Sequence, residues 1–203
     1  MIKTTLKQNT PLKSKFLDTS QNLFVVLEGL DGTGKSTQSR LLEKSLRLER
    51  KSTSGLQSKP ENPFQRFIAY MDNNAEATHE YRTNSSSNRI ILDRYVASTF
   101  ASYKAETLEC PSGLKWHEYY PKNLPLPHIV INIEISENER LLRIIDRGEE
   151  RDSHENRLAQ DFEYRYCFKE WLRAMSSVTI NAGGLDVHEL HQQILSKIKE
   201  LVD

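Results

Sequence analysis

The stretch LEGLDGTGKSTQSRLL, from Leu27 to Leu42, joins an apolar run to a helix-like pattern. Within it, GLDGTGKS (residues 29–36) fits the pattern G-x-x-x-x-G-K-S/T. The run before it, LFVVLE (residues 23–28), is typical of a strand that is covered on both faces. Glycines in such a turn let backbone N–H groups point inward around a phosphate, and a helix that starts near Gly34 adds partial positive charge. The stretch therefore predicts a phosphate-binding loop between a strand and a helix.

A nucleoside triphosphate with Mg²⁺ is the ligand that such a loop holds. We expect Lys35 to reach the β and γ phosphate oxygens and the Ser36 hydroxyl to contact Mg²⁺. A glycine-rich turn can also serve close packing alone, but its place after a strand and before a helix favours phosphate binding. The residues expected to bind ATP are Gly29, Asp31, Gly32, Thr33, Gly34, Lys35, Ser36, Thr37 and, from a later helix, Arg143.

The composition limits the kinds of partner. The 203 residues fit one domain with a sizeable core, and 28 basic residues balance 28 acidic ones, so we expect no nucleic-acid partner. The apolar runs are far shorter than the roughly 20 residues that span a bilayer, and we expect a soluble protein with no membrane partner. Only Cys110 and Cys167 are present, without a CxxC motif, which indicates a reducing compartment rather than a disulfide framework or a zinc site.

We divide the chain into a flexible tail over residues 1–21 and one domain over residues 22–203. The first twenty residues hold four lysines and one acid, with no arginine before Arg40. Because transit peptides are usually rich in arginine, a solvated tail and a cytoplasmic location are favoured. A mitochondrial location is the alternative, if the tail is a targeting segment.

Apolar segments alternate with helical patterns along the domain. Strands are expected at residues 23–28, 88–93, 128–135 and 177–180. Helices are expected from Gly34, from Phe64 towards Tyr81, from Val96, over 138–146, through Phe162 and Trp171, and over 187–202. Residues 50–63 are polar and rich in turn formers, and no strand is assigned there. The alternation predicts an α/β fold with a parallel sheet, helices on both faces and ligands at the carboxyl ends of the strands.

Two charged residues, Asp93 and Arg94, follow directly on the apolar strand IILD. An acid at this place can hold Mg²⁺ or its waters, so Ser36 and Asp93 are the expected metal ligands. Arg94 can clamp a second phosphate with its planar guanidinium group. A surface ion pair is the plain alternative, but the phosphate loop on the neighbouring strand favours function. Because no N-K-x-D motif of a GTPase occurs, transfer of a phosphoryl group to a small molecule is favoured.

The segment RIIDRGEERDSHENR carries four arginines among acids, namely Arg143, Arg147, Arg151 and Arg157. Guanidinium groups on a closing lid stabilise the charge that spreads over the oxygens during phosphoryl transfer, and the lid excludes water. We expect a mobile lid over about residues 147–156, with Gly148 as its hinge. A charged, solvated loop is the alternative.

Together these motifs resemble the thymidylate kinase family of nucleoside monophosphate kinases. The resemblance covers roughly residues 23–202, and it rests on the order of LEGLDGTGKSTQ, DRYVAS, SENERLLRIIDRG and the arginine-bearing lid. It implies a P-loop NTPase fold with a five-stranded parallel sheet, and ATP with Mg²⁺ as the donor. It further implies a homodimer and transfer of the γ-phosphoryl group to the 5′-phosphate of a pyrimidine deoxynucleotide.

The resemblance also implies roles for single residues. Asp31 matches the acid that contacts the 3′-hydroxyl of the acceptor sugar, Arg94 matches the arginine that grips the acceptor phosphate, and Tyr70 lies where an aromatic ring stacks on the base. Gly32 stands where some members have a catalytic arginine, so the lid must supply it. The expected catalytic residues are Lys35, Arg94, and Arg147 or Arg151. The expected acceptor-binding residues are Asp31, Arg66, Tyr70, Asn74, Arg94, Tyr95, Ser98, Ser102 and Tyr103.

Three departures from the family pattern bear on the acceptor. Asn74 replaces an arginine that reads thymine, and an amide can donate to a carbonyl or accept from an amino group, which leaves cytosine and uracil open. The usual phosphate-gripping motif after the second strand is missing, and Lys59 and Arg66 are its substitutes. Ser102 stands where bacterial members place a tyrosine that crowds the sugar 2′ position, with Tyr103 one place later, so selectivity for deoxyribose is open.

We expect an ATP-dependent kinase that converts dTMP to dTDP. The alternatives are a UMP, CMP or dCMP kinase, because DRYVAST and GLKWHEYYPKNLPLP also resemble the mitochondrial UMP-CMP kinase branch, and a catalytically weak nucleotide-binding paralogue. A deoxynucleoside kinase is less favoured, because Arg94 would then lack its phosphate partner.

Overall fold

A computed structural model describes residues 21–53, 55–56, 58–83, 88–113, 115–148 and 152–202. The predicted tail, apart from Gln21, lies outside the described residues, as do residues 149–151 of the predicted lid. The division into tail and domain and the mobility of the lid therefore stay predictions. Within the described part of the chain, no helix has the length and apolar character needed to cross a bilayer.

Five parallel strands form one sheet in the order β2-β3-β1-β4-β5, which confirms the predicted α/β fold. The strands are β1 (Leu23–Glu28), β2 (Glu49–Ser52), β3 (Arg89–Asp93), β4 (Ile129–Glu134) and β5 (Val178–Asn181). Leu27 of β1 pairs with Asp93 of β3 and with Ile131 of β4. This register brings the carboxyl end of β3 beside the loop that leaves β1.

The strand β2 overlaps the start of the polar segment 50–63, where no strand was assigned, and begins one residue before it. It pairs with β3 alone at one edge of the sheet, and its residues ERKS are half-buried or exposed. An edge strand of this kind carries charged side chains and lacks the apolar run that marks a central strand, so the sequence pattern did not indicate it.

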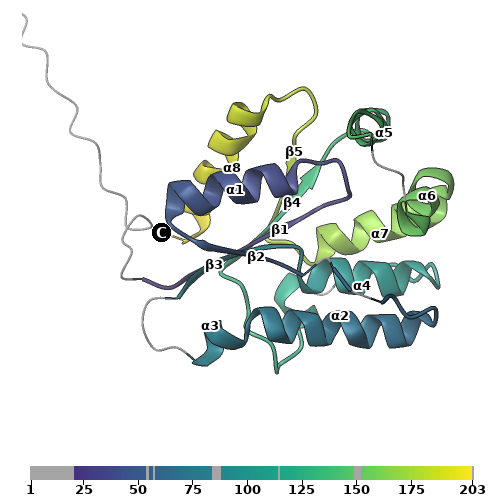
Figure 1. Cartoon of the computed structure of the whole chain (residues 1–203), viewed down its shortest axis with the longest axis horizontal. Coiled ribbons are helices and arrows are strands. Elements are labelled where there is room, and N and C mark those ends of the chain that lie inside the picture. Colours follow the sequence, from purple (N-terminus) through teal and green to yellow (C-terminus); the bar gives the residue numbers. More distant parts are fainter. Residues whose placement is uncertain are drawn as a thin grey trace, which may run out of the picture.

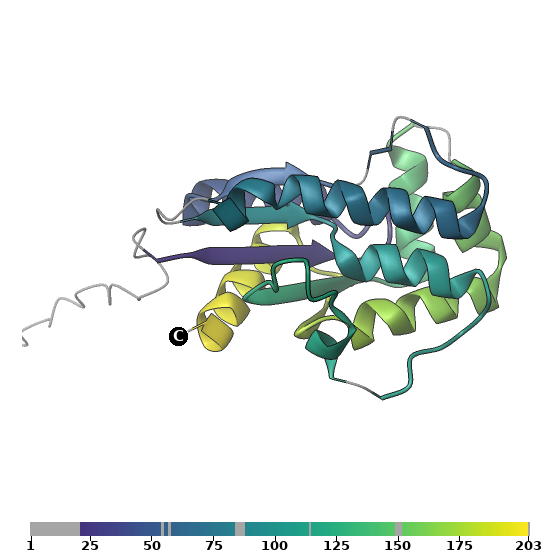
Figure 2. The same cartoon turned by 90° about the horizontal axis from the view of Figure 1, so that it is seen from below.

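Helices cover both faces of the sheet (Figure 1). α1 (Lys35–Leu46) and α8 (Val187–Val202) lie on one face, and α2 (Pro63–Ala77), α3 (His79–Thr83), α4 (Val96–Ala105) and α7 (Phe162–Ala174) lie on the other. A short 3-10 helix, η2 (Trp116–Tyr119), lies between α4 and β4 in the chain. α5 (Glu137–Asp146) and α6 (Ser153–Gln160) stand beyond the carboxyl ends of the strands (Figures 1 and 2).

The alternation of side chains along β1 divides the core in two. Phe24 and Val26 pack with α4 and α7 residues such as Phe168 on one face, while Val25 and Leu27 pack with residues of α1 and α8 on the other. Full burial of each such side chain stabilises the fold by about 1.5–3 kcal/mol. The site loops therefore leave a rigid, doubly covered sheet.

Candidate active site

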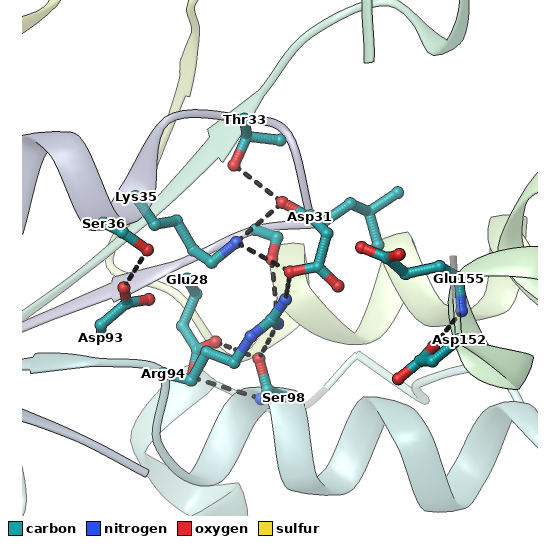
Figure 3. Close-up of polar contacts among 12 residues, drawn as sticks. Glu28, Asp31, Thr33, Lys35, Ser36, Asp93, Arg94, Ser98, Asp152 and Glu155 are labelled. Carbon is teal, nitrogen blue, oxygen red and sulfur yellow. Dashed lines mark hydrogen bonds and ion pairs between the residues drawn. The ribbon is translucent and has the colours of Figure 1, made fainter. Parts of the chain in front are cut away.

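The loop after β1 has the backbone geometry that a phosphate cradle needs (Figure 3). Gly29 has a φ of 142°, and a Cβ atom there would lie 2.5 Å from the Ile133 carbonyl oxygen, so only glycine fits. Gly34 has a φ of 96° and caps the N-terminus of α1. The predicted helix start at Gly34 is thus met within one residue. The first N–H groups of a helix have no partner within the helix, so this end of α1 is suited to bind a phosphate.

Lys35 crosses the inside of this loop. Its Nζ atom donates to the Leu30 carbonyl oxygen at 2.7 Å and lies 3.9 Å from Asp31 Oδ1. Burial, together with the positive charge of Arg94, lowers the pKa of Lys35 to about 8. A phosphate oxygen can take the place of the Leu30 carbonyl as the acceptor of this ammonium group.

Ser36 and Asp93 meet at the mouth of the loop, where the Ser36 hydroxyl donates to Asp93 Oδ2 at 2.6 Å. The pair fits Mg²⁺, because this ion takes oxygen ligands and usually relies on one or two protein side chains together with phosphate oxygens and waters. The described residues contain no cluster of three or more His, Cys, Asp or Glu side chains that could hold a metal ion.

Arg94 lies beside Asp31 and forms the other wall of this centre (Figure 3). Its Nη2 donates to Asp31 Oδ1 at 2.6 Å, and its Nη1 donates to the Gly29 carbonyl oxygen at 3.0 Å and to Ser98 Oγ at 2.9 Å. Burial alone would raise the pKa of Asp31, but the charges of Arg94 and Lys35 outweigh it and hold that pKa well below its usual range. Asp31 is thus an ionised acceptor between two cations.

Glu28 is a structural partner of this centre that the sequence analysis missed. It is fully buried, and its Oε1 accepts from the backbone N–H groups of Tyr95 at 2.9 Å and Ser98 at 3.2 Å, while Oε2 contacts the Ser98 hydroxyl. Burial raises the pKa of Glu28. Glu28 fixes the start of α4, where Ser98 holds Arg94. An acid at the end of an otherwise apolar strand, directly before the loop, was the available signal.

A cavity of about 780 Å³ extends from this centre between α2, α4, α6 and α7. Half of the predicted site residues line it, namely Asp31, Lys35, Ser36, Arg66, Tyr70, Asp93, Arg94, Tyr95, Ser98 and Ser102. Lys59 lines it too, and its Nζ lies 2.9 Å from Asp152 Oδ2 at the start of α6. The remaining loop residues Gly29, Gly32, Thr33, Gly34 and Thr37 lie in the phosphate loop or in the first turn of α1.

Asn74 does not line the cavity, which corrects its predicted role as a base reader. Only 1 % of the residue is exposed, and its Nδ2 donates to Thr99 Oγ1 on α4 at 3.1 Å. The packing of α2 against α4 holds Asn74 in the contact between these two helices and away from the cavity that Tyr70 lines. Thr99 faces the cavity in its place.

Tyr103 also differs from its predicted place. Its ring packs against Phe67 at a centroid distance of 4.9 Å, and it does not line the cavity. Arg66 lines the cavity, and its Nη2 donates to Glu106 just after the end of α4. Its role as a substitute for the missing phosphate-gripping motif stays a prediction. The family pattern gave no basis for these contacts, because they depend on how α2 packs against α4.

The lid arginines are only partly placed. Arg147 pairs with Glu155 at 3.1 Å and lies outside the cavity, and Arg151 falls outside the described residues. Arg143 pairs with Glu139 at 2.6 Å, and its Nη1 lies 3.5 Å from the Gly32 carbonyl oxygen, over the phosphate loop. This position suits the predicted contact of Arg143 with ATP.

His154 of α6 also lines the cavity, and the sequence analysis did not single it out. Its Nδ1 lies 3.3 Å from the Tyr164 hydroxyl, and its ring packs against Phe168 at 5.4 Å. Burial, and then the charge of Arg94, lowers the pKa of His154 to about 4. A single histidine in a charged segment gave no sequence signal for this role.

Comparison with known proteins decides the family. The thymidylate kinase family model matches residues 56–194, a range that begins after the phosphate loop, so the match and the loop motif are separate observations. The chain belongs to the thymidylate kinase family. This kinase is therefore a nucleoside monophosphate kinase that takes its phosphoryl group from ATP, and the predicted family, fold and enzyme class are confirmed.

Individual relatives agree with this placement. The kinase is 24 % identical over 197 residues to a probable thymidylate kinase of Methanococcus aeolicus, which covers 88 % of this chain and 97 % of the relative. Its fold is similar to that of thymidylate kinase from Candida albicans, with a TM-score of 0.65 and 18 % identity over 89 % of this chain and 92 % of the other. It is also similar to deoxyadenosine kinase from M. mycoides, solved with the products dCMP and dCDP, with a TM-score of 0.61 and 18 % identity over 88 % and 100 % of the two chains.

Proposed function

We propose that this kinase transfers the γ-phosphoryl group of ATP to the 5′-phosphate of dTMP, forming dTDP and ADP. The observation that carries the proposal is the approach of two cations to one carboxylate. Lys35 Nζ, from the donor loop, and Arg94 Nη2, from the wall of the cavity, lie 3.9 Å and 2.6 Å from Asp31 Oδ1. Two nucleotides that enter from the loop and from the cavity bring their phosphates together at this point.

The transfer needs no protonated or covalent enzyme intermediate. An oxygen of the acceptor phosphate attacks the γ phosphorus, the bond from that phosphorus to the bridging oxygen breaks, and ADP leaves with the electron pair. A phosphate monoester has a second pKa of about 6, so its oxygen is already deprotonated at neutral pH. The protein therefore contributes position and charge, which Lys35, Arg94 and the loop N–H groups supply.

Mg²⁺ and the lid complete the proposal. Ser36 and Asp93 would hold the ion, which neutralises charge on the donor phosphates when bound. Arg147 or Arg151 would enter when the lid closes, and Arg147 must exchange its partner Glu155 to do so. Chelation with EDTA is expected to stop the reaction, and added Mg²⁺ to restore it.

A second acceptor class has one observation in its favour. Ser102 lines the cavity while Tyr103 turns away from it, so no tyrosine crowds the sugar 2′ position at this register. A ribonucleotide such as UMP is therefore the second candidate acceptor.

An acceptor panel tests the proposed function. ADP release is measured with ATP and each of dTMP, dUMP, dCMP, UMP, CMP and thymidine, with Lys35→Ala as the inactive control. Turnover with dTMP above that with thymidine supports the proposal. ATP binding without turnover on any monophosphate would instead point to a nucleotide-binding paralogue.

We also propose that two copies of the kinase associate, as its family implies. Phe64 and Ile68, one helical turn apart on α2, are exposed apolar side chains that such an interface can cover. Light scattering should give twice the mass of one chain, and Ile68→Glu should reduce it toward a single chain. A monomer at every concentration would contradict this proposal.

A further inference from the structure

Three charged side chains meet at the far end of the cavity. Arg66 Nη2 of α2 donates to Glu106 Oε1 at 2.7 Å, and Arg157 Nη1 of α6 contacts Glu106 Oε2. The side chains of Arg66, Glu106 and Arg157 are 23 %, 18 % and 39 % exposed, and all three line the cavity. We call these three residues the triad. Each guanidinium group holds a different oxygen of the same carboxylate.

The triad lies one nucleoside away from the phosphate centre. Ser98, Ser102 and Glu106 follow each other at i, i+4 and i+8 along the α4 side of the cavity, and Ser98 bonds to Arg94 at the near end. Eight residues of helix span roughly 12 Å. An acceptor whose phosphate meets Arg94 therefore directs its base toward Glu106.

Further contacts along the cavity wall hold both arginines in place. Arg66 Nη1 donates to the Pro60 carbonyl oxygen at 3.1 Å, and the Arg157 guanidinium carbon lies 3.9 Å above the centre of the Tyr164 ring. A carboxylate offers about four lone-pair sites, and the two arginine contacts use two of them. Glu106 can thus accept a further hydrogen bond from a ligand without losing its partners.

The order of hydrogen-bonding groups across the triad is donor, acceptor, donor. Arginine only donates, and an ionised carboxylate only accepts. One edge of thymine or uracil presents the complementary order: the O4 carbonyl, the N3–H group and the O2 carbonyl. Cytosine presents an amino group, a bare N3 and a carbonyl, so its first two groups would meet groups of their own kind. We propose that Arg66, Glu106 and Arg157 together read the O4–N3–O2 edge of a thymine or uracil acceptor and make cytosine nucleotides poor acceptors.

This inference rests on the proposed function, since it assumes that the acceptor binds in the cavity, and wild-type specificity is its first test. The kinase should use dTMP and dUMP with kcat/KM about 10- to 100-fold above dCMP, the discrimination expected of one good multiple hydrogen-bond contact. Binding of dTMP and dCMP without ATP, measured by calorimetry, should show the same preference. Equal binding of the two nucleotides would overturn the inference even if the protein turns over neither.

Variants separate base reading from a purely structural ion-pair network. Glu106→Gln replaces one acceptor oxygen by a donor, and the dTMP to dCMP ratio of kcat/KM should fall about 10-fold or more, mainly through KM for dTMP. Glu109→Gln is the matched control: this side chain is 58 % exposed, pairs with Lys104 at 2.7 Å and lies outside the cavity.

The ratio of kcat/KM for dTMP to that for dCMP is compared only among variants that unfold cooperatively on heating. If Glu106→Gln fails to fold, Arg66→Lys serves as the second test, because lysine keeps the charge but loses the planar fork. An unchanged ratio in the triad variant, together with full dTMP activity, would contradict base reading and leave the kinase assignment intact. If the wild type is inactive with every acceptor but binds dTMP better than dCMP, the proposed kinase function is contradicted and base reading by the triad still holds.

Discussion

Arg94 Nη2 donates to Asp31 Oδ1 at 2.6 Å, and this contact joins the end of β3 to the phosphate loop after β1. Arg94 sits in a left-handed backbone conformation, with a φ of 72°, that turns its side chain back over the loop. The two residues follow different strands and are 63 positions apart, yet they form a single charged centre where donor and acceptor phosphates can meet.

Replacement of Arg94 by lysine tests this centre. Lysine keeps the charge but loses the planar fork that clamps a phosphate, so kcat/KM for dTMP should fall by about 100-fold while KM for ATP changes little. Arg173→Lys, in an exposed ion pair with Glu134 at 2.6 Å, is the matched control and should keep wild-type kinetics. Equal losses for ATP and dTMP would show that Arg94 does not belong to the acceptor side.

Glu28 should be a positioning residue whose loss is seen in stability as well as in rate. Glu28→Ala leaves the buried N–H groups of Tyr95 and Ser98 without their acceptor, which costs about 1–3 kcal/mol for each group. Glu28→Gln keeps an acceptor oxygen and should lose less. Urea unfolding gives both values, and an alanine variant as stable as the glutamine variant would exclude this role.

The pH dependence of ATP capture follows from Lys35. Its pKa in the free enzyme is lowered from 10.5 to about 8 by burial and by Arg94. The protonated form binds phosphate, so kcat/KM for ATP should be level below pH 8 and fall about tenfold per pH unit above it. Bound ATP brings negative charge close to Lys35 and so favours its protonated form. We therefore expect kcat to stay constant to a higher pH than kcat/KM does. A kcat/KM that stays level to pH 10 would contradict this account.

His154 should affect stability at acidic pH. Its folded-state pKa of about 4 lies below the usual value of 6.5, so the unfolded chain binds a proton first as the pH falls. The folded state should therefore lose up to about 3 kcal/mol between pH 6.5 and pH 4 through this residue. His154→Gln should flatten that part of the curve of unfolding free energy against pH. Identical slopes for the wild type and the variant would refute the buried, neutral state of His154.

Local patterns predicted the parts of the fold and site that depend on neighbouring residues. The loop from Gly29 to Ser36 follows from spacing along a few residues, and Asp93 and Arg94 follow from their place after an apolar strand. The edge strand β2 was not predicted, because its residues ERKS show no apolar or alternating pattern. Family analogy placed Asn74 in the cavity, but the packing of α2 against α4 buries it.

The triad could not be predicted, because it is made by tertiary packing. Glu106 meets partners 40 and 51 positions away, and nothing near it in the sequence marks it as part of a site. The roles of Glu28 and His154 likewise depend on the residues that surround them in the folded chain. Arg66 and Arg157 were noted in the sequence, but their joint contact with Glu106 follows only from the packing of α2, α4 and α6.

Transfer of radioactive phosphorus from the γ position of ATP tests the central claim most directly. With dTMP as the acceptor, the label should appear at the β position of dTDP, in equal amount to ADP, and the transfer should be lost in Lys35→Ala and strongly reduced in Arg94→Lys. Label that appears only as inorganic phosphate, or no transfer to any pyrimidine monophosphate, would contradict the meeting of two nucleotides at Asp31, Lys35 and Arg94.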